Sequence, residues 1–204
     1  MKYIIHRGIV SNEIDENTYG SIKRALRNYS SYGVELDVRL TKDRKIVLSH
    51  NSLIDFNTIE NMNYLDIIKR KYLTTLDKIL DISTDKVLLI DIKTNNNYKI
   101  FGDTLIKYLS NSKRKIYLCS FDKKIINYLK NKVPYKLGYI LFIYKKVNTD
   151  FIMVNYNGVS NKKLLKALNK DVFLWTITNE KELVQIKEKF SNVDDYFLII
   201  DKEE

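Results

Sequence analysis

Short apolar runs alternate with longer amphipathic segments along the whole chain. Each run is a nearly unbroken series of apolar residues only a few positions long, which is typical of parallel strands covered on both faces. We therefore expect eight buried strands, at 3–5, 34–38, 87–92, 115–120, 137–142, 151–155, 172–177 and 197–200.

Helical patterns occupy several of the intervals between these runs. Apolar residues recur there at spacings of three and four, which indicates a helix with one buried face. The predicted helices lie within 17–31, 123–131, 161–170 and 180–190, and either Asn17 or Thr18 is the expected N-cap of the first. The segment 37–50 differs, because a polar turn around 42–44 separates two strand patterns and predicts a β-hairpin that grows from the second strand.

Eight strands separated mostly by helices fit two α/β architectures, a (β/α)8 TIM barrel and a doubly wound sheet. The chain has 204 residues, which is lean for a barrel, whose usual length is roughly 250. No glycine-rich phosphate loop follows the first run, so the main sign of a nucleotide-binding sheet is missing. The sequence therefore predicts one domain, 1–204, folded as a compact (β/α)8 barrel with a hairpin after strand 2.

The composition is that of an ordinary globular protein, with 45% hydrophobic and 29% charged residues. The single cysteine, Cys119, excludes an internal disulfide and fits a reducing compartment; we interpret it as a small apolar residue on a buried strand. The longest apolar run, 137–144, is far shorter than the roughly 20 residues of a membrane-spanning helix. With no secretory signal before His6, we expect a cytoplasmic protein without a transmembrane segment.

The net charge of +10 favours anionic partners. Nucleic acid, an anionic membrane surface and a phosphate-bearing substrate all fit that charge. Because the basic residues are spread along the chain and form no long run, a solvated lysine-rich surface explains much of the charge. We expect a small anionic substrate and no nucleic-acid partner.

Three carboxylates and a lysine fall at the ends of two predicted strands, where the active sites of barrels form. Glu35 and Asp37 are two residues apart on one strand and so face the same way. Asp91 and Lys93 repeat that spacing on the next. Converging carboxylates are costly unless a cation or a proton compensates them, and a hard divalent ion, Mg²⁺ or Ca²⁺, suits oxygen ligands.

The only two histidines of the chain are expected at the same mouth. His6 ends the first run, and His50 ends the return strand of the hairpin. An imidazole titrates near neutral pH, which suits general acid–base catalysis. A lone histidine at a strand end is more often structural than catalytic, but two histidines and three carboxylates at the ends of neighbouring strands favour a functional site.

Three segments, HRG at 6–8, ENT at 16–18 and ELDVRLTKDRKIVLSHN at 35–51, closely resemble the glycerophosphodiester phosphodiesterase family. Weaker similarities follow at 74–80, 88–93, 120–122, 175–178 and 198–201. The resemblance implies a (β/α)8 barrel enzyme. It also implies metal-dependent hydrolysis of a glycerophosphodiester to glycerol 3-phosphate and an alcohol.

The resemblance further implies a role for each matching residue. The implied set is His6 and His50 for acid–base catalysis, Glu35, Asp37 and Asp91 for the metal ion, and Arg7 and Lys93 for the phosphate. Trp175 either walls the glycerol pocket or fills the barrel core, and Phe121 is expected at the pocket rim. Gly8 is expected to allow a tight turn beside the phosphate.

Three residues depart from the family pattern. Asp91 stands in place of a glutamate, Asn51 in place of an aspartate, and Asp15 in place of a proline. The chain also lacks the larger insertion that many relatives carry between strands two and three. Two alternatives stay open: hydrolysis of a glycerol-phosphate polymer or a lysophospholipid headgroup on the same barrel, and a catalytically silent phosphate-binding barrel.

Overall fold

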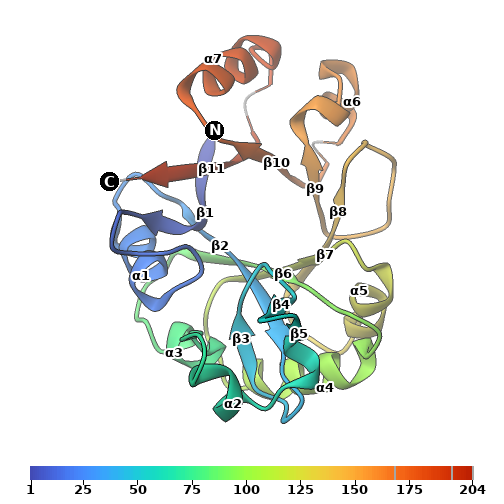
Figure 1. Ribbon diagram of the computed structural model, residues 1–204. Coiled ribbons are helices and arrows are strands. Elements are labelled where there is room, and N and C mark those ends of the chain that lie inside the picture. Colours follow the sequence, from blue (N-terminus) through green and yellow to red (C-terminus); the bar gives the residue numbers. More distant parts are fainter. Residues whose placement is uncertain (168, 194, 204) are drawn as a thin grey trace.

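Eight parallel strands close into a barrel in the computed structural model, which describes residues 1–167, 169–193 and 195–203 (Figure 1). The strands are β1 (Lys2–Val10), β2 (Gly33–Leu40), β6 (Val87–Ile92), β7 (Ile116–Ser120), β8 (Lys136–Leu141), β9 (Phe151–Asn155), β10 (Asp171–Ile177) and β11 (Phe197–Glu203). Each pairs with the next, and β1 pairs with both β2 and β11, which closes the ring. The predicted (β/α)8 barrel is confirmed.

Helices surround this ring of strands (Figure 1). They are α1 (Tyr19–Arg27), α2 (Tyr64–Ile68), α3 (Leu76–Leu80), α4 (Tyr98–Leu109), α5 (Lys123–Leu129), α6 (Asn161–Ala167) and α7 (Glu180–Lys189), with 3-10 turns η1 (Ile59–Asn61) and η2 (Tyr156–Gly158). Helix α4 lies in an interval for which the sequence analysis named no helix. Residues 142–150, all described, connect β8 to β9 without a helix, so a loop covers the barrel there.

The hairpin predicted after the second strand is present. Its return strand, β3 (Ile46–Leu48), pairs antiparallel with the end of β2. A second, smaller hairpin follows, formed by β4 (Leu53–Ile54) and β5 (Asn57–Thr58). A separate apolar cluster that includes Val47, Ile59 and Ile67 packs the two hairpins and the segment after them together beside the barrel mouth.

The strands separate an outer and an inner apolar core. On β2, Leu36 and Val38 belong to the outer core against the helices, so the alternating residues of the strand point into the barrel. The amino-terminal part of the interior is filled by aromatic rings, among which Phe173 and Phe197 stack with centroids 4.4 Å apart. Polar side chains nearer the mouth therefore lie on an apolar floor that excludes water from beneath them.

Cys119 is fully buried on β7 within the inner core, as the sequence analysis proposed. Burial raises the pKa of its thiol well above the ordinary value, which leaves the thiol unreactive. Across residues 1–167, 169–193 and 195–203, every helix is too short or too polar to span a bilayer.

Candidate active site

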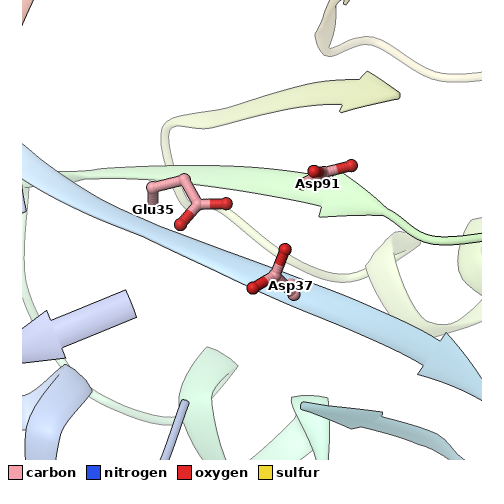
Figure 2. Close-up of side chains that lie close together, drawn as sticks. All are labelled: Glu35, Asp37 and Asp91. Atoms are coloured by element: carbon pink, nitrogen blue, oxygen red, sulfur yellow. The ribbon is translucent and has the colours of Figure 1, made fainter. Parts of the chain in front are cut away.

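Three carboxylates meet inside the barrel, from β2 and β6 (Figure 2). The strand register places Asp37 directly beside Asp91, and Glu35 lies two residues earlier on the same face of β2. Glu35 and Asp37 are each 1% exposed and Asp91 is 3% exposed. One oxygen of each lies within 4.8 Å of the others. This spacing of buried oxygens makes the trio a candidate site for a divalent cation.

Burial and mutual repulsion shape the protonation of the trio. Burial, together with the charges of Asp37 and Asp91, raises the pKa of Glu35 well above its ordinary value. Burial also raises the pKa of Asp91 to about 6, against the opposing charge of Lys93. Burial would raise the pKa of Asp37 as well, but Lys93, Arg7 and a hydrogen bond from Asn17 outweigh it and lower that pKa.

Two cations partly neutralise the trio. The Lys93 Nζ atom lies 2.6 Å from Asp91 Oδ2 and 3.1 Å from Asp37 Oδ1, and Arg7 Nε lies 2.9 Å from Asp37 Oδ2. Burial would lower the pKa of Lys93, but the charges of Asp91 and Asp37 outweigh burial, so the pKa is raised above its ordinary value. When all are ionised, three negative charges face two positive ones.

Asp91 Oδ1 supplies an independent sign that the trio is incomplete. It is buried and accepts no hydrogen bond from any described residue. A buried carboxylate oxygen without a partner is costly. A cation at this oxygen would supply both the missing partner and the missing charge, so the residues present fit a divalent metal ion.

The HRG segment forms a sharp bend in β1. Arg7 and Gly8 both have positive φ, 52° and 94°, and the pairing register of β1 is interrupted here. A Cβ atom on Gly8 would lie 2.5 Å from the backbone carbon of Ser21 in α1, so only glycine fits. The bend aims the Arg7 N–H at Glu35 Oε2, 3.3 Å away. The tight turn expected at Gly8 agrees with this geometry.

The three residues of the ENT segment each make a different contact. Glu16 accepts from Arg7 Nη1 with both carboxylate oxygens at 3.0 Å. Asn17 is buried, donates to Asp37 Oδ2 at 2.9 Å and accepts from the Asp37 N–H at 3.0 Å. Thr18 is the N-cap of α1. Of the two N-cap candidates the structure selects Thr18, which frees Asn17 to orient Asp37.

His6 is held by a residue that the sequence analysis did not name. Its Nδ1 atom lies 2.6 Å from Asp201 Oδ1, and its Nε2 atom lies 3.8 Å from Glu35 Oε2. A carboxylate can only accept, so Nδ1 carries the proton and Nε2 faces the site. The available signal was an acidic residue at the end of the last apolar run, the pattern shared by Asp37 and Asp91.

His50 lies just after β3, the return strand of the hairpin. Its side chain is exposed, and its backbone carbonyl accepts from Arg39 Nη2 at 2.8 Å. A cavity of about 230 Å³ adjoins the ring and is also lined by Asn17, Lys71 and Tyr72. The hairpin therefore brings the second histidine to the mouth, as expected, but with solvent access.

The electrostatic surroundings of His50 favour its neutral form. Partial burial lowers the pKa of the ring, Asp37 opposes this effect, and the cations Arg7 and Lys93 lower the pKa further. The net direction is downward, so the ring is ready to accept a proton at neutral pH.

Aromatic rings form one wall of the mouth. The Trp175 ring lies 5.8 Å from Phe121 and 5.4 Å from Phe142, centroid to centroid. Trp175 also packs on the inner core, which fits one of the two alternatives raised from the sequence, and its role in a glycerol pocket stays a prediction. Its Nε1 atom is buried without a hydrogen-bond partner among the described residues. Phe121 is 44% exposed at the rim, and Phe142 is a wall residue that the sequence analysis missed.

Comparison with known proteins bears on this arrangement. Residues 6–193 match the model of the glycerophosphoryl diester phosphodiesterase family. A glycerophosphodiester phosphodiesterase of Caldanaerobacter subterraneus subsp. tengcongensis is 27% identical over 158 residues. That match covers 66% of this chain and 64% of the relative, so it spans just under two thirds of that protein.

Two solved structures share the fold. A glycerophosphodiester phosphodiesterase from Thermotoga maritima superposes with a TM-score of 0.72 at 24% identity, covering 98% of this chain and 94% of that one. An Oleispira antarctica phosphodiesterase, solved in complex with the product sn-glycerol-3-phosphate, has a TM-score of 0.81 at 15% identity, covering 100% of this chain and 92% of that one.

Proposed function

Because the chain belongs to the glycerophosphoryl diester phosphodiesterase family, we propose that it hydrolyses a glycerophosphodiester to glycerol 3-phosphate and an alcohol. The observation that carries this proposal is the buried trio of Glu35, Asp37 and Asp91 beside His6 at the barrel mouth. The sn-glycerol-3-phosphate bound to the Oleispira antarctica protein supports the same substrate class.

In this proposal Glu35, Asp37 and Asp91 hold a divalent ion. When bound, such an ion neutralises charge that develops on phosphoryl oxygens. Arg7 and Lys93 would add cationic contacts to the same oxygens. In the free protein both cations are paired with Asp37, and Arg7 also with Glu16, so their heads are already fixed at the edge of the site.

His6 and His50 divide the proton transfers. One imidazole removes the proton of the attacking group, which is water or the neighbouring glycerol hydroxyl, and the other protonates the departing alcohol oxygen. If the glycerol hydroxyl attacks, water then opens the resulting cyclic phosphate to glycerol 3-phosphate. Asp201 fixes the orientation of His6, so Nε2 is the atom that exchanges a proton with the substrate. His50, with its lowered pKa and solvent access, would act from the end of the hairpin.

In this proposal the aromatic wall binds the glycerol part of the substrate. The faces of Trp175 and Phe121 would pack against glycerol carbons, and the unpartnered Trp175 Nε1–H would donate to a substrate oxygen. Lys93 Nζ lies 5.9 Å from the Phe121 ring centroid, so this wall adjoins the proposed phosphate site.

A hydrolysis panel tests the proposal. Glycerophosphodiesters with different alcohols, a glycerol-phosphate polymer and a lysophospholipid would be incubated with the protein, with and without a chelator. We expect release of glycerol 3-phosphate from the small diesters, lost on chelation. Preferred cleavage of the polymer or the lysophospholipid would change the substrate, and no cleavage of any diester would favour a silent binding barrel.

Lengthening one proposed ligand should be tolerated. Asp91→Glu restores the longer carboxylate implied by the family resemblance, and we expect unchanged or tighter metal binding in a calorimetric titration. Asp91→Asn is the matched control and should weaken binding strongly, because a neutral amide replaces an anionic ligand. Loss of metal binding in Asp91→Glu with an intact circular dichroism spectrum would remove residue 91 from the ligand set.

Removing the partner of His6 should slow turnover without weakening substrate binding. Asp201→Asn keeps the shape of the side chain but not its charge, and we expect kcat to fall by roughly 10–100-fold with KM little changed. The pH–rate profile should shift as well, which loss of a merely structural contact would not cause. Asp195→Asn is the control, because Asp195 pairs with Lys2 far from the site. Equal kinetics in both variants would contradict the positioning role.

A further inference from the structure

Two neighbouring loops at the barrel mouth hold apolar side chains in solvent next to lysines. Phe121 follows β7, and Phe142 and Ile143 follow β8; they are 44%, 65% and 70% exposed. Lys123 and Lys145 lie two residues beyond Phe121 and Ile143 and are both exposed. We call these five residues the mouth patch.

The apolar part of the mouth patch is held in place. The Phe121 and Phe142 rings stack with centroids 5.0 Å apart. Just beyond, the Tyr144 N–H donates to the Gly158 carbonyl at 2.9 Å, and Gly158 packs so closely on the backbone of Phe142 and Ile143 that a Cβ there would clash. The loop therefore presents Ile143 and Phe142 outward, and such exposed apolar groups mark an interaction site.

The rim of the mouth patch is strongly cationic. Segments 121–124 and 142–146 carry Lys123, Lys124, Lys145 and Lys146 against one acid, Asp122. Both Asp122 oxygens are engaged, by the Thr94 hydroxyl at 2.7 Å and the Lys124 N–H at 2.8 Å. Lys145 lies beside Lys123 and lowers its pKa, and neither forms an ion pair with a described carboxylate. An anionic partner would relieve this repulsion.

We propose that the mouth patch docks the barrel onto an anionic lipid bilayer, with Phe142 and Ile143 entering the interface and the lysines meeting headgroup phosphates. Apolar side chains at a loop tip, flanked by lysines, match a surface that is apolar below and anionic above. Nucleic acid fits less well, because Ile143, the most exposed apolar residue of the patch, offers no ring for base stacking, and the Phe121 and Phe142 rings already stack on each other. The net charge of +10 adds longer-range attraction to the same surface.

Docking in this orientation would turn the mouth toward the membrane. Phe121 belongs both to the mouth patch and to the aromatic wall of the site, so the two are continuous. A diester carried by a lipid would then reach the site without leaving the interface. This consequence rests on the proposed function, but the docking itself does not, so the two can fail separately.

Vesicle co-sedimentation tests the docking. The wild-type protein should bind vesicles of phosphatidylcholine mixed with phosphatidylglycerol more tightly than phosphatidylcholine alone, and added salt should weaken that binding. Lys123→Gln/Lys145→Gln should bind about 10–30-fold more weakly, since each basic residue near such a surface contributes on the order of one kcal/mol. Ile143→Ser should lose about tenfold through the missing apolar contact.

Matched control variants lie at the other end of the barrel. Tyr29→Ser removes a side chain that is 98% exposed before β2, and Lys113→Gln/Lys115→Gln removes two exposed charges before β7. Both should bind vesicles like wild type. The proposal would be overturned if the control variants weakened binding equally, or if the wild-type protein bound no vesicles. It would also be overturned by equal affinity for both vesicle types or by retention on polyuridylate RNA alone.

Hydrolysis of a soluble glycerophosphodiester separates the two claims. Ile143→Ser and Lys123→Gln/Lys145→Gln should cleave it at the wild-type rate, while their vesicle binding is reduced. Vesicle binding by a protein that cleaves no diester would retain the docking and reject the proposed function. A wild-type protein that cleaves the soluble diester but binds neither vesicle type would retain the proposed function and reject the docking.

Discussion

Replacing either His6 or His50 with alanine should lower kcat by roughly 10²–10⁴-fold, the usual contribution of a general acid or base. The two rings come from different segments: a hydrogen bond to Asp201 holds His6 on β1, and His50 follows the β2–β3 hairpin. Because each handles one half of a linked proton transfer, the double variant should be little slower than the worse single variant.

A substrate with a strongly activated leaving group would assign the two roles. It needs no proton on the departing oxygen, so it should rescue the variant that lacks the acid and leave the other slow. The measurement is kcat for both single variants on two leaving groups, with circular dichroism as the folding check. Folding should survive, because residues at the carboxyl ends of barrel strands serve chemistry more than stability. Near wild-type rates in one variant would exclude that histidine from catalysis.

The strands and the carboxylate trio could be predicted from the sequence because both follow from local spacing. Buried parallel strands are read as short apolar runs, and residues two apart on a strand share a face. Glu35 and Asp37 therefore had to point the same way, and the pairing of β6 with β2 brought Asp91 beside them. Helix α4 was missed although Phe101, Leu105 and Leu109 are spaced by four and buried.

The partners of the site residues depend on contacts that no local pattern reveals. Asp201 reaches His6 across 195 positions only because β11 pairs with β1 and closes the ring. Asn17 reads as a helix cap until the backbone shows that Thr18 takes that place. Phe142 looked like the end of a strand, and its stacking on Phe121 depends on how the β8–β9 loop packs on Gly158.

Exhaustive chelation should abolish hydrolysis, and Mg²⁺ or Ca²⁺ should restore it. Three buried carboxylates face two cations, and Asp91 Oδ1 has no partner among the described residues, so the free site lacks positive charge where a phosphodiester must bind. A metal ion contributes several kcal/mol of transition-state stabilisation, which corresponds to about 10³-fold or more in rate. Full activity after chelation would contradict the metal requirement. Glu35→Gln should lose the response to added ion while keeping its fold.

Thermal unfolding offers a second readout of the ion that needs no substrate. Because the pKa of Asp91 is raised to about 6 in the folded, metal-free protein, the folded state binds more protons than the unfolded state between about pH 4 and 6. The contribution of Asp91 to the stability of the metal-free protein is therefore greatest at low pH and is lost as pH rises through this range. An ion competes with that proton, so the part of its stabilising effect that depends on Asp91 should be full above about pH 6 and fade below it, and the raised pKa of Glu35 adds a dependence of the same sign. Melting temperatures measured with and without the ion should therefore diverge as pH rises, and a constant difference across this range would show that the ion binds away from Asp91.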